Sequence, residues 1–156
     1  MRINRLALLS GAILMLSAAA PAMAQSISAK NPEAMRSALA AAGHAVELKK
    51  DSDGDPLISV EIKGLRFSIA FFGCEIHVGC TTVALYKAFR SDKKLTADQL
   101  NRFNGSTRFA RAYLDGEGDP TIQLDMLLVE GISSNAFVAH AEIFRATVGA
   151  FLEQVK

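Results

Sequence analysis

Short runs in which apolar and polar residues alternate, separated by tight polar turns, constrain the fold of this chain more than any other feature. Such runs lie at residues 46–49, 58–62, 67–71, 83–90, 109–114 and 122–128. Alternation with a period of two is typical of strands that bury one face, and tight turns between consecutive strands imply antiparallel pairing. The sequence therefore predicts an antiparallel sheet with one covered face.

Helix signals mark three further segments. Asn31 before Pro32 is a capping pair, and Thr96 with Gln99 three residues later forms a capping box. A third helix, capped by Ser133 or Ser134, is predicted by an apolar stripe at helical spacing: Phe137, Ala141, Phe144, Val148, Phe151 and Val155. The expected order is α-β-β-β-β-α-β-β-α, an α+β fold with the helices packed on one face of the antiparallel sheet.

Two acidic turns at residues 51–56 and 115–120 both end in Gly-Asp-Pro, a weak internal echo. Their alternating carboxylates match the start of an EF-hand calcium loop. That loop needs glycine at its sixth position and glutamate at its twelfth, where the first turn has Pro56 and Ile62. We therefore expect solvated hairpin turns, and a shared weak cation site only if both turns lie at one edge of the sheet.

The first 24 residues predict export. Arg2 and Arg5 precede an apolar run over residues 6–20, and a small-x-small site ends at Ala24. This is the pattern of a secretory signal peptide cleaved before Gln25. We expect residues 1–24 to be removed and residues 25–156 to form a single periplasmic domain that is not inserted in the membrane.

Charge and motifs exclude several functions. Removing Arg2 and Arg5 leaves 15 of the 17 basic residues, against 16 acidic ones. A nearly neutral chain has no field that attracts nucleic acid. The sequence contains no P-loop, no G-x-G-x-x-G and no H-E-x-x-H, and none of its serines lies in a G-x-S-x-G elbow. We expect no catalytic residue and no cofactor, so the chain is predicted not to be an enzyme.

Cys74 and Cys80 are the only cysteines and flank five residues between two strands. In an oxidising compartment, a pair across a hairpin tip is expected to form a disulfide. His77 lies midway between them, so a zinc or copper site remains an alternative, although no fourth ligand is evident. A redox dithiol is a weaker alternative, because the spacing is not C-x-x-C.

Arg111 and Asp125 are predicted to pair across the last hairpin. A turn centred on Gly118 leaves each of them seven positions away, and the same register sets Leu114 opposite Ile122. The two charged residues would then lie on the uncovered face. The candidate partner surface there comprises Phe109, Arg111, Tyr113 and Asp125, with Gln123 and Leu127 on the same face.

Residues 103–120 read Phe103-Asn-Gly-Ser-Thr-Arg-Phe-Ala-Arg-Ala-Tyr-Leu-Asp-Gly-Glu-Gly-Asp-Pro120. With Asp125 and Gly131, this run resembles the YbjN domain family, and the resemblance extends over about residues 31–153. Phe103 stands where that family commonly has tryptophan. The family's members are described as candidate regulators of bacterial sensory transduction. The resemblance implies a fold similar to type III secretion chaperones and a regulatory or protein-binding activity, with no catalytic residues to transfer.

Two functional hypotheses follow. The first is a non-enzymatic periplasmic binding or regulatory module that acts through protein contacts in sensory or stress signalling, and that could be a homodimer. The second is a small-molecule or metal-binding protein that uses Cys74, His77, Cys80 or the acidic turns. An exposed apolar patch would favour the first hypothesis. A bound cation or a pocket of convergent polar groups would favour the second.

Overall fold

The computed structural model of the protein describes residues 26–90 and 95–154. The predicted signal peptide, residues 1–24, lies outside the described residues, as does Val155 of the expected apolar stripe. The helices are α1 (Pro32–Ala41), α2 (Ala97–Ser106) and α3 (Ser134–Gln154).

Six strands form one antiparallel sheet in the order β2-β3-β4-β5-β7-β6. Their bounds are β2 Ala45–Lys50, β3 Pro56–Ile62, β4 Leu65–Phe72, β5 Thr82–Ala88, β6 Arg111–Leu114 and β7 Pro120–Leu127. The predicted α+β fold with an antiparallel sheet is confirmed. A separate pair, β1 (Ser26–Ile27) and β8 (Ile132–Ser133), was not predicted, because two residues are too few to show alternation.

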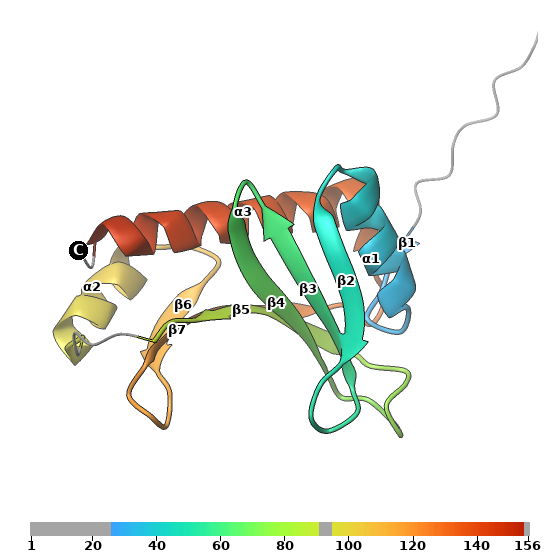
Figure 1. Ribbon diagram of the computed structural model, residues 1–156, viewed down its shortest axis with the longest axis horizontal. Helices are drawn as coiled ribbons and strands as arrows, with labels where there is room; N and C mark the ends of the chain where they lie inside the picture. Colours follow the sequence, from blue (N-terminus) through green and yellow to red (C-terminus); the bar gives the residue numbers. More distant parts are fainter. Residues whose placement is uncertain (1–25, 91–94, 155–156) are drawn as a thin grey trace, which may run out of the picture.

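The helices cover one face of the sheet. Figure 1 shows α3 running along the whole sheet, with α1 at the end near β2 and α2 at the end near β6. The predicted stripe of α3 is buried from Phe137 to Phe151. The ring of Phe144 packs edge-on against Phe67 of β4, with centroids 5.0 Å apart, and Phe151 packs in the same way against Phe103 of α2. These aromatic contacts hold the long helix against the sheet and against α2. All three described helices therefore lie on the same face, and the opposite face of the sheet has none of them.

The predicted helix starts are confirmed by their hydrogen bonds. Asn31 Oδ1 accepts from the backbone N–H of Ala34 at 3.0 Å. The capping box of α2 is complete, with Thr96 and Gln99 each accepting from the other's backbone N–H. For α3 it is Ser133, rather than Ser134, whose hydroxyl accepts from a backbone N–H of the first turn.

The two acidic turns have the same structure. Asp51 Oδ1 accepts from the backbone N–H groups of Asp53 and Asp55, and the Asp51 N–H donates to the carbonyl of Asp55 at 2.9 Å. Asp115 makes the equivalent three bonds to Glu117 and Asp119. The glycine before each final Asp-Pro has a positive φ, a conformation that glycine adopts without strain.

The expected register of the last hairpin was wrong by two residues. Arg111 lies opposite Gln123 rather than Asp125, and Leu114 lies opposite Pro120 rather than Ile122. The cause is the turn, which Asp115 closes around Glu117 rather than around Gly118. A shift of two residues keeps every side chain on its expected face, because the period of a strand is two.

Phe109 does not belong to a strand, contrary to the expectation from alternation. β6 begins at Arg111, and Phe109 has a φ of 69°. Left-handed backbone at a bulky residue interrupts an extended strand. The chain therefore leaves the line of β6 before it has covered the whole of β7.

Candidate functional site

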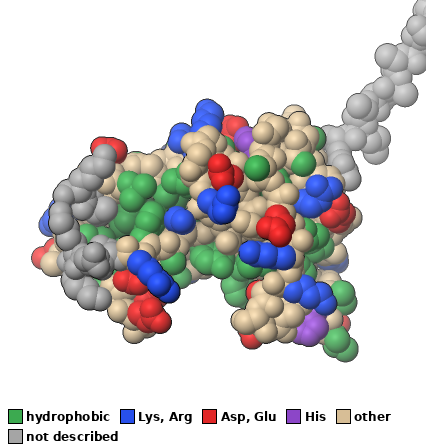
Figure 2. All heavy atoms as spheres, in the orientation of Figure 1, with side chains coloured by type: hydrophobic (Ala, Val, Ile, Leu, Met, Phe, Trp, Pro, Cys, Tyr) green, Lys and Arg blue, Asp and Glu red, His purple; other side chains and the backbone are tan. Residues whose placement is uncertain are grey.

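The face of the six-stranded sheet turned away from α3 is called here the open face. The register places Ser59, Ser68, Tyr86, Gln123 and Arg111 in one row across it, from β3 to β6. In Figure 2, the side of the molecule away from α3 is hollowed between the β6–β7 hairpin and the β2–β3 hairpin. The open face is therefore a broad accessible surface.

A connected polar network lies at the β6–β7 end of the open face. Tyr113 donates from its hydroxyl to Gln123 Oε1 at 2.7 Å, and Gln123 Nε2 donates to Asp125 Oδ1 at 2.6 Å. Arg111 Nη1 donates to the other oxygen, Asp125 Oδ2, at 2.6 Å. Asp125 thus joins both charged and neutral donors, and the Arg111–Asp125 pair forms diagonally rather than directly across the strands.

The Arg111–Asp125 ion pair contributes little to stability. The side chain of Arg111 is 58% exposed and that of Asp125 is 47% exposed. Exposed ion pairs of this kind are worth about 0–1 kcal/mol. The Arg111 guanidinium also lies 5.9 Å from the centre of the Tyr113 ring. Because the pair contributes so little free energy, Arg111 and Asp125 can form contacts with another molecule instead at little cost to the stability of the fold.

Three exposed apolar residues border this network, and we call them the apolar rim: Phe72, Phe109 and Leu127. Their exposed fractions are 51%, 59% and 73%. Phe72 and Leu127 both lie opposite Thr82, one on each side of it, and Phe109 lines the same pocket as Leu127. Large apolar side chains gathered at the surface of a protein commonly mark an interaction site.

Asn104 has a role that the sequence did not reveal. Its side chain accepts from the backbone N–H of Ala112 at 2.7 Å and donates to the carbonyl of Ala112 at 3.0 Å. Asn104 lies in the last turn of α2, and its amide pairs with β6 as a neighbouring strand would. The outward N–H and C=O groups of Ala112, in the middle of the β6 edge, are satisfied in this way.

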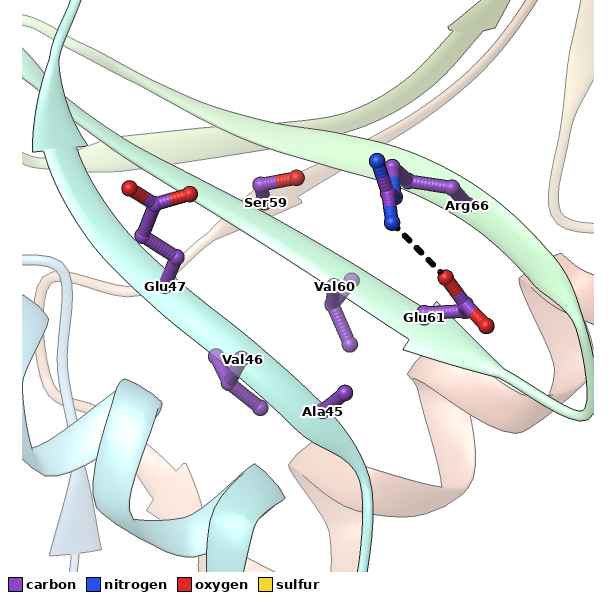
Figure 3. Close-up of a pocket in the computed structure, with 7 residues that line it drawn as sticks. All are labelled: Ala45, Val46, Glu47, Ser59, Val60, Glu61 and Arg66. Carbon is purple, nitrogen blue, oxygen red and sulfur yellow. Dashed lines mark hydrogen bonds and ion pairs between the residues drawn. The ribbon is translucent and has the colours of Figure 1, made fainter.

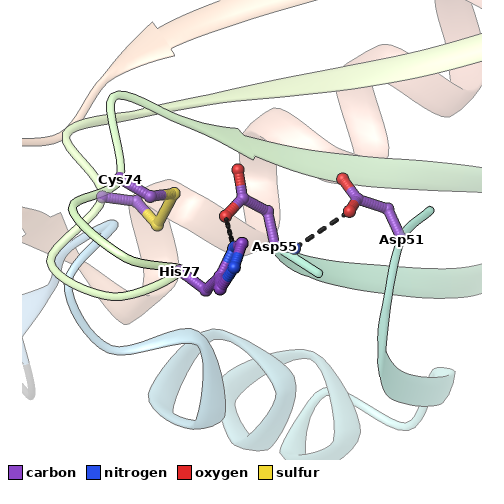
Figure 4. The surroundings of a disulfide bond; sticks show 5 residues. Asp51, Asp55, Cys74 and His77 are labelled. Carbon is purple, nitrogen blue, oxygen red and sulfur yellow. Dashed lines mark hydrogen bonds and ion pairs between the residues drawn. A yellow bond between two sulfur atoms is a disulfide. The ribbon is translucent and has the colours of Figure 1, made fainter. Parts of the chain in front are cut away.

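The disulfide loop carries a second cluster (Figure 4). Cys74 and Cys80 are bonded to each other. Between them, Glu75 and Val78 exchange two backbone hydrogen bonds around a two-residue turn, in which Ile76 and His77 both have positive φ. The resulting tip is rigidly held, because the disulfide and the backbone bonds both close it.

His77 links this loop to the β2–β3 turn. Its Nδ1 lies 2.8 Å from Asp55 Oδ1, and its ring lies against Gly54. Both cysteine sulfurs are engaged in the disulfide, so they offer no thiolate to the metal site considered for Cys74, His77 and Cys80. Within residues 26–90 and 95–154, no three His, Cys, Asp or Glu side chains come together as a metal site would require.

The two acidic turns do not share a site. They belong to hairpins at opposite edges of the sheet, since β2 and β6 are its outermost strands. The condition for a shared cation site is therefore not met. In each turn the first aspartate already accepts two backbone hydrogen bonds, which matches the expectation of solvated turns.

Two hollows near β2 offer few converging groups. One lies on the open face over β2, β3 and β4, where Arg66 and Glu61 form an ion pair at 3.0 Å and point toward each other (Figure 3). The other lies beside the start of α1, where Arg36 hydrogen-bonds to Glu33 and lowers the pKa of that carboxyl. Glu47 also lines the first hollow, and Lys49, Lys50 and His77 line the second, where His77 is already paired with Asp55.

The other two histidines lie within or just after a helix. His140 Nδ1 lies 2.8 Å from the carbonyl of Ala136 in the preceding turn of α3. His44 follows α1, with its Nε2 buried and 3.7 Å from Glu142 Oε1 on α3. No serine hydroxyl is hydrogen-bonded to either ring among the described residues. His140 thus caps a carbonyl within its own helix, and His44 lies where α1 ends against α3.

Comparison with known proteins gives one match. The family model YbjN, described as "Putative bacterial sensory transduction regulator", matches residues 31–156. No curated protein matches the chain, and no solved structure matches it. In the described part of the chain, none of the helices combines the length and the apolar character needed to cross a bilayer.

Proposed function

The chain belongs to the YbjN family, and we propose that it is a non-enzymatic periplasmic regulatory module that acts through protein–protein contacts in sensory or stress signalling. The family is described as one of regulators rather than of enzymes. One observation carries the proposal: an exposed polar network bordered by the apolar rim, on the face of the sheet opposite α1, α2 and α3.

The chemistry of this surface suits a protein partner. Interfaces combine apolar contacts, which supply most of the binding energy, with polar groups that set orientation. Phe72, Phe109 and Leu127 provide the first kind of contact. Arg111 and Asp125 provide the second, because each is about half exposed and can contact an incoming group. Arginine and aromatic residues are also enriched among the residues that dominate binding.

The periplasmic location rests on residues 1–24 and agrees with the disulfide, a bond that persists in oxidising compartments. Fractionation of cells that express the full chain, followed by N-terminal sequencing, tests it. We expect soluble periplasmic protein that begins at Gln25. Recovery with Met1 retained, or in the membrane pellet, contradicts the location.

Photo-crosslinking in living cells tests the partner contact. Benzoylphenylalanine replaces Phe72, a change that preserves an aromatic ring at the apolar rim, and in a matched control it replaces Lys49 on β2. We expect one discrete adduct with a protein from the Phe72 position and none from Lys49. Equal labelling from both positions, or no adduct from Phe72 at native expression, contradicts a partner site on the open face.

A further inference from the structure

One stretch of β7 has no neighbouring strand on its outer side. β5 pairs with β7 from Thr121 to Leu127, whereas β6 pairs with it only from Pro120 to Gln123. Residues Leu124–Leu127 are therefore paired on one side only, among the described residues. We call this stretch the β7 window.

The backbone groups of the window that point outward can be identified from the register. The N–H of Leu128 donates to the carbonyl of Thr81, and the N–H of Phe89 donates to the carbonyl of Pro120. The even-numbered residues of β7 therefore direct their N–H and C=O groups toward β5, since these groups alternate along a strand. Asp125 and Leu127 then direct theirs outward, and they present two donors and two acceptors to a strand that would lie beside them.

Both ends of the window are closed. At one end Arg111 pairs with Gln123, and at the other the carbonyl of Leu128 accepts from the N–H of Ala29 at 3.3 Å. A strand that enters here can align with only about four residues, or roughly 13 Å. This length fits a short extended segment.

The other edges of the sheet are protected, and the window is not. The exposed side chains of the β2 edge include Glu47, Lys49 and Lys50, and charge of this kind discourages edge pairing. On the short β6 edge, Asn104 already occupies the outward N–H and C=O groups of Ala112. In the window, the exposed side chains are Leu127 and Asp125, whose charge is already neutralised by Arg111.

A pocket of ≈ 370 Å³ lies beside the window. It is lined mostly by apolar side chains from β7 and its surroundings: Phe109, Leu124, Met126, Leu128, Ile132 and His140, together with Asp125 and Leu127. A strand laid along the window would alternate its side chains, so that some enter this pocket while their neighbours lie beside Leu127 and Asp125 on the open face.

We propose that the β7 window binds an extended segment of a partner protein as an added strand, with apolar side chains of that segment in the adjoining pocket. The proposal rests on the proposed function and names the mode of contact. Strand addition derives its affinity from main-chain hydrogen bonds and its specificity from pockets for alternate side chains, and the window supplies both.

A second copy of this chain fits the window less well. In a twofold pairing of two windows, the β6 strand of the second copy would lie in line with β7, where Ala29 and Leu128 already pair. A separate extended segment meets no such obstacle, because only about four of its residues need to lie against the sheet.

Selection of peptides on the mature protein, residues 25–156, tests the proposal. The probe is a library of random eight-residue peptides. Leu127→Pro removes one outward N–H without removing a bond to β5, Leu127→Ala shortens the side chain only, and Lys50→Pro removes an outward N–H from the protected β2 edge. We expect the selected peptides to have apolar residues at every second position. Their Kd should rise about tenfold or more for Leu127→Pro, the effect of losing ~1.4 kcal/mol. It should rise less for Leu127→Ala and stay unchanged for Lys50→Pro.

N-methylation of alternate peptide nitrogens provides a second measurement, which holds even if Leu127→Pro fails to fold. It should weaken binding to the unmodified protein about tenfold, because the donors of the added strand are lost.

Three results overturn the proposal: no peptide is selected, N-methylation has no effect, or the free protein is a dimer that Leu127→Pro dissociates. If the Phe72 adduct forms equally in the Leu127→Pro protein, the partner contact stands and strand addition is wrong. Absence of that adduct in every variant contradicts the proposed function itself.

Discussion

The β2–β3 and β6–β7 hairpins turn through the same Asp-x-x-Gly-Asp-Pro pattern. In both, the first aspartate accepts two backbone hydrogen bonds and donates one. The two hairpins nevertheless leave different edges on the sheet. β2 pairs along its full length, and His77 contacts the turn that follows it. β6 pairs over four positions, and half of β7 has no strand on its outer side within residues 26–90 and 95–154. Identical turn chemistry thus fixes the local structure, while the neighbouring segments decide which edge is available.

The difference can be traced to a few residues outside the turns. Phe109 adopts left-handed backbone and ends the line of β6, and Asn104 occupies the outward backbone groups of Ala112 on that strand. At the other hairpin, the disulfide loop positions His77 against Asp55. Side chains therefore protect one position of the β6 edge and hold the β2–β3 turn, whereas no described residue protects the outer side of the second half of β7.

Asn104→Ala is expected to have the largest effect on stability. It leaves the N–H and C=O of buried Ala112 without partners, which should cost roughly 2–3 kcal/mol. Urea unfolding measures the loss. Asn101→Ala, an exposed change in the same helix, is the matched control and should cost far less. Equal losses in the two variants would show that Asn104 does not hold the edge of β6.

Replacing both cysteines with serine should cost about 2 kcal/mol, because a loop of this length then gains entropy in the unfolded chain. The effect should be local to the β2–β3 hairpin, since His77 and Asp55 lose their fixed geometry. Amide exchange around Asp55 should accelerate while that around Asp119 stays the same. Equal acceleration in both turns would contradict the distinction between the hairpins.

Asp51→Ala and Asp115→Ala test whether the two turns are equivalent. Each removes an acceptor of two backbone hydrogen bonds in an exposed turn, and each should cost about 1 kcal/mol. Thermal or urea unfolding of the two variants gives the comparison. A difference well above ~0.5 kcal/mol would show that the surroundings, rather than the shared turn, dominate the stability of one hairpin.

The smallest effect is expected for the Arg111–Asp125 pair. A double-mutant cycle with Arg111→Ala and Asp125→Ala should give a coupling free energy of roughly 0.2–1 kcal/mol, because both side chains are about half exposed. High salt should reduce it. A coupling of several kcal/mol would identify the pair as a structural element and weaken the case that it serves a partner.

Local sequence signals were sufficient for much of this fold. The capping box at Thr96 and Gln99, the cap at Asn31 and the stripe of α3 all describe interactions between residues close in the chain, and the structure contains them. Alternation also assigned faces correctly in β3, β4 and β7. Such patterns are reliable because each is set by a single helix turn or strand.

The errors arose where one side chain decides a longer-range arrangement. Asp115 closes its turn around Glu117, and this displaced the predicted register by two residues. Phe109 continues the alternating pattern, so its positive φ could not be read from the sequence. Asn104 acts on Ala112, eight residues away, through a contact that exists only once α2 packs beside β6. The β7 window follows from the first two of these features, and no local pattern indicated it.

Amide hydrogen exchange of the free mature protein tests the central claim most directly, because it needs no partner. Thr121 and Gln123 pair with β6, whereas the N–H groups of Asp125 and Leu127 point outward, with no strand of the described chain beside them. The account predicts slow exchange at Thr121 and Gln123 and fast exchange, close to that of an exposed loop, at Asp125 and Leu127. Slow exchange at all four positions would show that the β7 window is already covered, and would contradict the claim that it is an open binding edge.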